Sequence, residues 1–415
     1  MTREQARLRA AFSRRQFLRA ASLASLAGAA AKPLAALAAE ETATLLFDNG
    51  ERPLVAYPQK RALLRHTTRP PQLETPFKVF NEGVITPNDA FFVRYHLSIS
   101  PPLSVDVDTF RVAVRGKVNS PLELSVADLK SQFEPVELVA VNQCSGNSRG
   151  FFEPRVPGGQ SGNGNMGNAR WRGARLKDVL AKAGVAAGAR QVSFNGLDAP
   201  LLPQTPDFVK ALDVDQAQDG EVMLAYAMNG EDLPMLNGYP LRLVVPGHYG
   251  TYWVKHLHEI TVLDEVFNGF WMNPAYRIPD NGCGCVEPGA APKKTVPINR
   301  YNVRSFITSL QTGDQVKVGR QLTARGIAFD GGYGIREVLF SQDGGRSWHE
   351  AELGKDLGRY SFREWTIPFT PDRAGEHVLK AKATNRIGQS QPMEPLWNPA
   401  GYMRNVVETV RVTAA

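Results

Sequence analysis

The sequence predicts an α+β fold in which a mixed domain of strands and helices precedes an all-β domain. Between residues 91 and 270, strand-like apolar runs alternate with helical segments. Residues 271–300 are rich in Pro, Gly and Asn, which predicts a long linker or wrapped loop. The remaining residues, 301–415, show only strand and turn patterns, which predict an immunoglobulin-like sandwich.

Local signals justify the individual elements. In LSVADLKSQF, Ser125 followed by Asp128 forms a capping box, which marks the start of a helix. GARLKDVLAKAGV places its large apolar residues on one helical face and ends near Gly184. The runs VELVAV, QVSFNG, VMLAYA and LRLVVPG predict strands, and QDGGRS predicts a hairpin in the C-terminal domain. Residues 40–90 predict an extended, Pro-punctuated lead-in.

Residues 1–39 predict an export signal. Arg14 and Arg15 precede an Ala- and Leu-rich stretch, and small residues around Ala36 and Ala38 follow as a cleavage site. An amphipathic first helix is disfavoured, because the stretch has too few polar residues. The paired arginines indicate the twin-arginine route, which exports folded proteins and predicts a periplasmic location. No later run of 18 apolar residues occurs, so no membrane span is expected.

Charge and cysteine content exclude several function classes. The leader holds seven Arg or Lys and one acidic residue, a net of +6 out of +7 for the chain, so no nucleic-acid partner is expected. Three cysteines do not make a disulfide framework. The sequence contains no C-x-x-C-H motif, so no covalently bound haem is expected. The 376 residues after the leader suggest two domains.

One cysteine stands at the end of a predicted strand, in AVNQCSGNSRGFF. A cysteine in a soluble domain is usually a small buried apolar residue. However, Cys144 is followed by Ser-Gly-Asn-Ser, which exposes backbone groups, and by Arg149, which favours a thiolate. A thiolate in a pocket suits a soft transition metal.

Two further segments carry candidate binding groups. In FFVRYHL, Arg94 and His96 alternate on one strand face, which suggests an anion site, or alternatively a salt-bridged surface strand. In PLRLVVPGHYGTYWVKHLHEI, a buried strand is followed by a glycine loop and Lys255, an arrangement that suits a phosphate. His256 and His258 have no Cys or carboxylate spaced to complete a metal site.

These segments, with MGNARWRGARLKDVL, FNGLD, GYPLRLVVPG and VKHL, resemble the sulfite oxidase family of molybdenum enzymes. Downstream, SQDGGRSW and PLWNPAGYMRN resemble the C-terminal dimerisation domain of that family, and the resemblance covers about residues 70–410. It implies a sulfite-oxidase-type molybdopterin domain over residues 40–270. It further implies a linker over 271–300 that contributes Tyr276, and an immunoglobulin-like dimerisation domain over 301–415.

The resemblance implies a role for each matching residue. Cys144 takes the place of the thiolate ligand of molybdenum. The implied pterin-binding residues are Phe92, Val93, Arg94, Tyr95, His96, Cys144, Asp198, Asn237, Arg242, Trp253, Val254 and Lys255. The implied catalytic residues are Cys144, Arg94, His96, Tyr276, Arg149 and Arg363. There are two departures: Asn237 stands where vertebrate members carry His, and Ser161 replaces a pocket tryptophan.

The implied activity is the oxidation of sulfite to sulfate at a mononuclear molybdenum centre held by molybdopterin. No haem domain precedes the core, so the implied electron acceptor is a separate cytochrome c, either soluble or a tightly bound subunit. A homodimer or heterodimer is implied by the C-terminal domain.

Three alternatives stay open. One is a sulfane-sulfur dehydrogenase subunit with the same fold and ligands. Another is a methionine sulfoxide reductase, which lacks the C-terminal sandwich, and the third is an exported binding or scaffold protein. Cys283 and Cys285 either form a disulfide or remain thiols.

Overall fold

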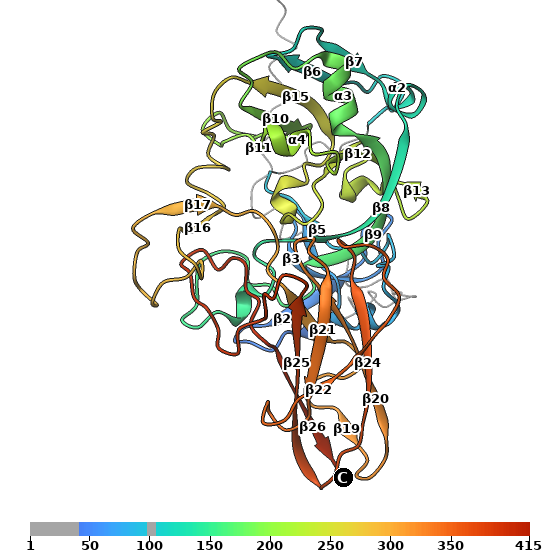
Figure 1. Cartoon of the computed structure of the whole chain (residues 1–415), viewed down its shortest axis with the longest axis vertical. Coiled ribbons are helices and arrows are strands. Elements are labelled where there is room, and N and C mark those ends of the chain that lie inside the picture. The colour runs from blue at the N-terminus through green and yellow to red at the C-terminus, as the bar shows by residue number, and fades with distance from the viewer. Residues whose placement is uncertain (1–40, 98–104) are drawn as a thin grey trace, which may run out of the picture. The chain divides into compact units, whose positions relative to one another are not determined.

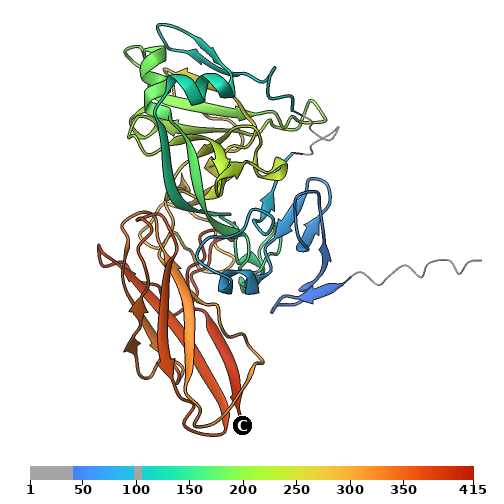
Figure 2. The ribbon, with the colours of Figure 1, turned by 90° about the vertical axis from the view of Figure 1, so that its right-hand side faces the viewer.

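The computed structural model describes residues 41–97 and 105–415, and the predicted export signal lies outside these residues. Most regular structure in the described residues is β, and the helices are short. Figures 1 and 2 show these strands and helices from two directions. The expected mixed domain and C-terminal sandwich are both confirmed, although the helical content is small.

Residues 41–94 form a five-stranded antiparallel sheet instead of a lead-in that is merely extended. Its order is β1-β2-β3-β4-β5. The strands are β1 (Thr42–Thr44), β2 (Glu51–Val55), β3 (Leu63–Thr67), β4 (Gln72–Glu74) and β5 (Val93–Arg94). These strands have two to five residues, too few for a clear alternating pattern, so the sequence did not reveal their pairing. Arg94 thereby sits at the end of a paired strand.

The next part of the chain contains two sheets. The first has the order β11-β10-β15-β6-β7, with β6 and β15 parallel and the other pairs antiparallel. Its strands are β6 (Val112–Gly116), β7 (Leu122–Leu124), β10 (Gln191–Gly196), β11 (Val209–Asp213) and β15 (Leu257–Leu263).

The second sheet has the order β13-β12-β9-β8, and β14 also pairs with β12. Its strands are β8 (Pro135–Gln143), β9 (Met166–Arg175), β12 (Met223–Met228), β13 (Glu231–Asp232) and β14 (Arg242–Val244). The register between β8 and β9 is unbroken from Pro135 to Gln143. Strand β8 is therefore a firm support for Cys144, which follows it directly.

The helices begin and end where the sequence predicts. In α2 (Val126–Gln132), the Ser125 hydroxyl accepts a hydrogen bond from the Asp128 amide, and the Asp128 carboxylate accepts one from the Ser125 amide. In α3 (Leu176–Ala183), Gly184 ends the helix in the left-handed conformation. A short third helix, α4 (Val214–Ala217), follows β11.

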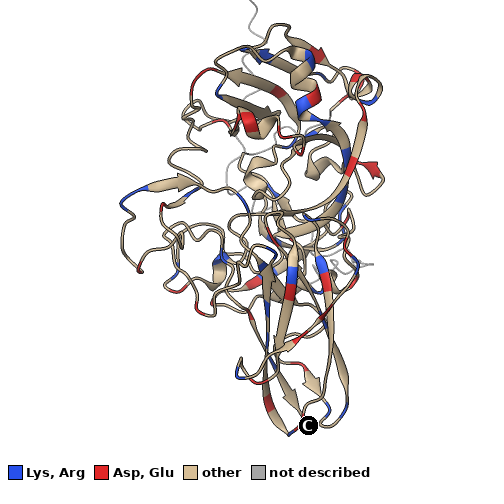
Figure 3. Cartoon of the chain, viewed as in Figure 1, with Lys and Arg blue, Asp and Glu red and all other residues tan. Residues whose placement is uncertain are grey.

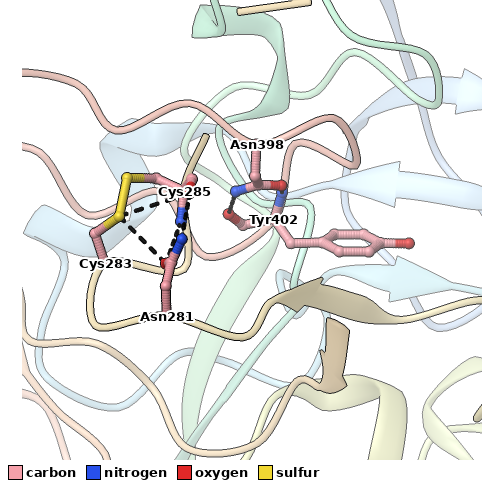
Figure 4. The surroundings of a disulfide bond; sticks show 5 residues. All are labelled: Asn281, Cys283, Cys285, Asn398 and Tyr402. Atoms are coloured by element: carbon pink, nitrogen blue, oxygen red, sulfur yellow. Dashed lines mark hydrogen bonds between the residues drawn. A yellow bond between two sulfur atoms is a disulfide. The ribbon is translucent and has the colours of Figure 1, made fainter. Parts of the chain in front are cut away.

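Residues 271–300 are not a plain linker, because they contain a small hairpin. Strands β16 (Arg277–Pro279) and β17 (Thr295–Pro297) pair antiparallel. The loop between them contains a disulfide bond between Cys283 and Cys285, which decides between the two predicted states of these residues (Figure 4).

The C-terminal residues form a sandwich of two sheets, with orders β18-β20-β24-β23 and β19-β26-β25-β21-β22 (Figure 1). The strands are β18 (Arg304–Ile307), β19 (Gln315–Val316), β20 (Leu322–Phe329), β21 (Ile335–Ser341), β22 (His349–Glu350), β23 (Glu352–Leu353), β24 (Arg363–Phe369), β25 (Gly375–Asn385) and β26 (Thr409–Ala414). The predicted QDGGRS hairpin joins β21 to β22. Trp365 is fully buried in the sandwich core.

Several residues tie the sandwich to β8. The Tyr301 hydroxyl donates to the Val141 carbonyl at 2.8 Å and accepts from the Gln143 amide at 3.1 Å. Phe306, Phe329 and Phe362 belong to the same apolar cluster as the core of the preceding domain.

The charges of the described residues are well mixed. Figure 3 shows basic and acidic residues interspersed along both the mixed domain and the sandwich. In the described part of the chain, no helix is long and apolar enough to cross a membrane.

Candidate active site

A cavity lies next to Cys144. Its wall is assembled from segments that are far apart in the sequence, including β5, the end of β8 and the loop after β14. The lining residues are Phe91, Phe92, Arg94, His96, Asn142, Cys144, Ser145, Phe208, Leu236, Asn237, Arg242, Gly250, Thr251, Trp253, Lys255 and Tyr276. The three segments singled out in the sequence therefore meet at one place.

The loop after β8 holds Cys144 by its backbone. The Cys144 amide donates to the Asn165 carbonyl at 2.9 Å, and its carbonyl accepts from the Asn147 amide at 3.0 Å. The Asn147 side chain in turn accepts a hydrogen bond from the Asn165 amide. With its backbone fixed on both sides, the half-buried thiol is presented to the cavity.

Three cationic side chains line the cavity, and none of them forms an ion pair with a carboxylate among the residues that the structure describes. Lys255 Nζ donates to the Arg94 carbonyl at 2.7 Å and lies 4.2 Å from the centre of the Tyr95 ring. Burial lowers the pKa of Lys255 to about 7, while the nearby Asp198 opposes this shift. Such a concentration of positive charge indicates an anionic ligand.

Arg242 is the most enclosed of these cations. Its guanidinium donates to the Asn237 carbonyl at 2.8 Å and lies over the rings of Trp171 and Trp253. Burial lowers the pKa of Arg242 to about 10, so it stays charged at neutral pH. It is therefore a permanent positive charge at one end of the cavity.

An aromatic cluster closes another side of the cavity. The His96 ring stacks on Phe208, with ring centres 4.1 Å apart, and His96 Nε2 is hydrogen-bonded to the Tyr276 hydroxyl. Burial, and next the charges of Arg94 and Lys255, hold the pKa of His96 well below its usual range. His96 is therefore neutral at pH 7, and Tyr276 is fixed by a neutral partner.

Several buried polar atoms that face this region have no hydrogen-bond partner in the described part of the chain. They are Asn142 Oδ1, Ser145 Oγ, Thr251 Oγ1 and Arg242 Nε. Gly250 permits the close approach of the loop, since a Cβ there would lie 2.3 Å from Asn142 Oδ1. Because buried polar groups are normally satisfied, these atoms indicate a polar ligand.

Comparison with known proteins decides the family. Residues 98–271 match the model of the oxidoreductase molybdopterin binding domain, and residues 295–415 match the Mo-co oxidoreductase dimerisation domain. The chain is 33% identical to the sulfite oxidase of Gallus gallus over 373 residues, which cover 86% of this chain and 79% of the relative. The chain belongs to the sulfite oxidase family.

Two further similarities agree with this membership. The mitochondrial sulfite oxidase of Macaca fascicularis is 34% identical over 372 residues, which cover 85% of this chain and 66% of the relative's length. The solved structure of the sulfane dehydrogenase SoxCD from Paracoccus pantotrophus has the same fold. That match covers 94% of both chains, with a TM-score of 0.71 and 24% sequence identity.

The residues of this cavity fit the molybdenum cofactor of the sulfite oxidase family. Cys144 offers a sulfur ligand, which suits a soft metal. Arg242 and Lys255 would offer positive charge for a phosphate group, and the unpartnered Asn142 and Thr251 oxygens would accept hydrogen bonds from a polar ring system.

Nine of the residues predicted for the site line this one cavity. They are Phe92, Arg94, His96, Cys144, Asn237, Arg242, Trp253, Lys255 and Tyr276. Arg94 and His96 lie on the cavity side of their strand, whereas the Tyr95 hydroxyl turns away and bonds to His256 Nε2 at 2.7 Å. His256 is thus engaged by a tyrosine and is no part of a metal site.

The other predicted residues lie outside the cavity lining. Val93 and Val254 pack in apolar clusters, and Asp198 is buried beside Lys255. Burial raises the pKa of Asp198 to about 6. Ser161 supports the Cys144 loop from behind, because its hydroxyl donates to the Gly146 carbonyl at 2.9 Å.

The structure does not bring the two outer arginines to the cavity wall. Arg149 lies behind Tyr276 and packs on the Tyr402 ring. Arg363 lies elsewhere, at the start of β24, where it pairs with Asp356 at 3.1 Å. Arg363 is not among the residues that line the cavity, and its implied pocket role stays a prediction.

Sequence reasoning missed several residues of the site. Asn142 and Ser145 flank Cys144, so their nearness to it in the sequence was a usable signal. Gly250 and Thr251 belong to the glycine loop that had been singled out only for phosphate binding. Phe208 gave no signal, and Tyr402 stood in the PLWNPAGYMRN motif without a predicted role, because only the tertiary fold brings these two rings to the site.

Proposed function

We propose that this protein oxidises sulfite to sulfate at a mononuclear molybdenum centre and passes the electrons singly to a separate cytochrome c. The observation that carries the proposal is the convergence on one cavity of Cys144, the His96–Tyr276 pair and three cationic side chains that have no ion-pair partner in the described part of the chain. The chain spans 66% of the length of the macaque relative named as a sulfite oxidase, so the activity is inferred from the site.

The protein's own residues would bind and orient the substrate. Arg94 presents a planar, permanently charged guanidinium that matches the oxygens of sulfite. The lone pair on the sulfite sulfur is then left free to react. The Tyr276 hydroxyl, held by neutral His96, is a hydrogen-bond donor or acceptor that adds no net charge beside the substrate. When bound, the molybdenum cofactor would supply the two-electron oxidation of sulfite and the release of the electrons one at a time to the acceptor.

The direct test is to purify the protein after cofactor insertion and to measure molybdenum content and sulfite-dependent reduction of cytochrome c. We expect one molybdenum per chain and reduction that depends on sulfite. Active protein without molybdenum would contradict the proposal.

A sulfane-sulfur dehydrogenase is the second candidate. The specific observation in its favour is the shared fold with SoxCD over 94% of both chains. Steady-state assays with sulfite alone, using cytochrome c and ferricyanide as acceptors, separate the two. Turnover of free sulfite supports the first candidate, whereas its absence in fully loaded protein supports the second.

The location and partner form part of the same proposal. The paired Arg14 and Arg15 support export of the folded protein to the periplasm by the twin-arginine route. The match of residues 295–415 to a dimerisation domain supports a homodimer or a heterodimer. Purification of the native complex would show its subunits, and a reduced-minus-oxidised spectrum would show whether a cytochrome accompanies it.

A further inference from the structure

A second tyrosine lies directly behind the active-site tyrosine. The rings of Tyr402 and Tyr276 stack with centres 5.3 Å apart and planes 11° from parallel. The Arg149 guanidinium lies 5.0 Å from the centre of the Tyr402 ring. Tyr402 therefore touches both the residue that faces the cavity and an arginine that was predicted to serve the anion site.

Arg149 is half-buried, and three glycines border its guanidinium. Its Nε donates to the Ala400 carbonyl at 3.2 Å, and no carboxylate pairs with it among the described residues. Three glycines make the space: a Cβ at Gly146, Gly158 or Gly401 would lie 2.6 to 2.9 Å from the Arg149 side chain. A larger residue at any of these three glycine positions would therefore displace the Arg149 guanidinium.

The segment that carries Tyr402 is firmly anchored. The Asn398 side chain donates to the Tyr402 carbonyl and accepts from the Tyr402 amide, and the Met403 amide donates to the Ser145 carbonyl at 3.0 Å. The loop with the Cys283–Cys285 disulfide lies beside this segment (Figure 4) and bonds to it from the Val286 amide to the Trp397 carbonyl. The ring position is thus set from several sides.

We propose that Tyr402 is a positioning residue of the anion site, whose ring holds the Tyr276 phenol at the cavity and the Arg149 guanidinium behind it, so that this positive charge acts on an oxyanion beside Tyr276. The proposal rests on the proposed function, because it assigns these two groups to a sulfur oxyanion. Burial raises the pKa of Tyr402, and the charges of Arg149, Cys144 and Arg94 all act on it, which agrees with its place among these groups.

A ring, and not merely bulk, is needed at this position. A flat aromatic face attracts the guanidinium through its quadrupole and stacks on Tyr276, whereas an aliphatic side chain of similar size fills the volume without either interaction. Comparison of Tyr402→Phe with Tyr402→Leu therefore separates positioning from simple packing.

The test uses the full chain with its cofactor, and the exposed Tyr333→Ala as a control. We expect Tyr402→Leu to raise the KM for sulfite about tenfold, with a much smaller change in kcat, because a cation–π contact of this kind is lost. Tyr402→Phe and Tyr333→Ala should keep the KM of the original protein. Calorimetric titration with sulfate should show the same loss of affinity in Tyr402→Leu alone.

Two results would overturn the inference. One is an unchanged KM and an unchanged sulfate affinity in Tyr402→Leu, and the other is an equal loss in Tyr402→Phe. Failure of the proposed function looks different, since loaded original protein would then not oxidise sulfite at all. Sulfate titration still tests Tyr402 in that case, because it requires no turnover.

Discussion

The polar groups that line the cavity around Cys144 differ from the buried Asp330 carboxylate inside the C-terminal sandwich. In the sandwich, the Asp330 carboxylate accepts hydrogen bonds from the Gly332 and Gly334 amides and from the Asn385 side chain, each at 3.0 Å. In the cavity, the side-chain oxygens of Asn142 and Thr251 have no partner among the described residues.

This difference separates groups that serve the fold from groups that wait for a ligand. A buried polar atom costs free energy unless it is paired, so a protein that leaves several unpaired at one place must recover that cost by binding. The Asp330 carboxylate of the sandwich recovers it through hydrogen bonds within the chain. Substitutions in the two regions should therefore separate activity from stability.

The largest effect is expected from Cys144→Ser. Loss of the sulfur ligand should lower sulfite oxidation by about a thousandfold or more, since even residues that only orient a metal ligand can contribute up to about a hundredfold. The melting temperature should barely change, because the loop is held by its backbone. Activity and thermal melts, with the exposed Ser131→Ala as a control, would check this. Near-normal turnover would remove Cys144 from the metal site.

Trp365→Ala should have the opposite effect, a loss of stability without a change in the KM. Trp365 is fully buried, and its Nε1 donates to the Ser305 hydroxyl at 3.0 Å. Its loss should lower the free energy of unfolding by roughly 3–5 kcal/mol, while the KM of the protein that remains folded stays the same. Urea unfolding would measure the loss. As a control, Trp348→Ala should lower the free energy of unfolding by less, because Trp348 is only half-buried. Equal losses would show that the sandwich core is not where its stability resides.

Arg94→Gln should act mainly on substrate affinity. A charged hydrogen bond contributes about 1.5–3 kcal/mol, so the KM for sulfite should rise by about 10- to 100-fold, with a smaller change in kcat. Steady-state kinetics with the exposed Arg111→Gln as a control would measure this. Unchanged kinetics in Arg94→Gln would exclude it from substrate binding.

The smallest effect is expected from Lys210→Met, read as a change in pH dependence. Burial lowers the pKa of Lys210 from 10.5 to about 7, so between about pH 7 and pH 10 the unfolded chain binds more protons than the folded chain. The free energy of unfolding should therefore rise with pH in this window, by up to about 1.4 kcal/mol per pH unit for this group.

Lys210→Met should remove this contribution, so its slope against pH should be shallower than that of the original protein. Denaturant unfolding at several pH values would measure the slopes, and the exposed Lys355→Met should keep the original one. Identical slopes for Lys210→Met and the original protein would show that Lys210 is not buried as described.

The parts of the fold that the sequence predicted are those set by near neighbours. The capping box at Ser125, the helix end at Gly184 and the hairpin after β21 all depend on residues a few positions apart. The sheet of β1 to β5 escaped prediction, because its pairs join short segments with little alternation. For the same reason the hairpin of β16 and β17 looked like a linker.

In the candidate site too, the residues found from the sequence are those with a distinctive local stretch, and the others depend on remote segments. Cys144, Arg94 and Lys255 were identified because each stands in a distinctive local stretch. The implied pocket role of Arg363 stays a prediction, because the structure pairs Arg363 with Asp356 and leaves it outside the cavity lining. Tyr402 was missed because its neighbours Tyr276 and Arg149 lie more than a hundred positions away in the chain.

The sequence by itself determined the family, the order of the domains and the thiol at the end of a strand, because these are properties of continuous motifs. Only the tertiary structure decided which charges stay unpaired, which polar atoms lack partners and which rings hold the arginines. Those properties depend on burial and on distances between remote segments, and a buried charge acquires its meaning only from what surrounds it. Arg149 shows this plainly: its neighbourhood in the chain suggested a thiolate, whereas the fold packs its guanidinium on the Tyr402 ring, which stacks on Tyr276.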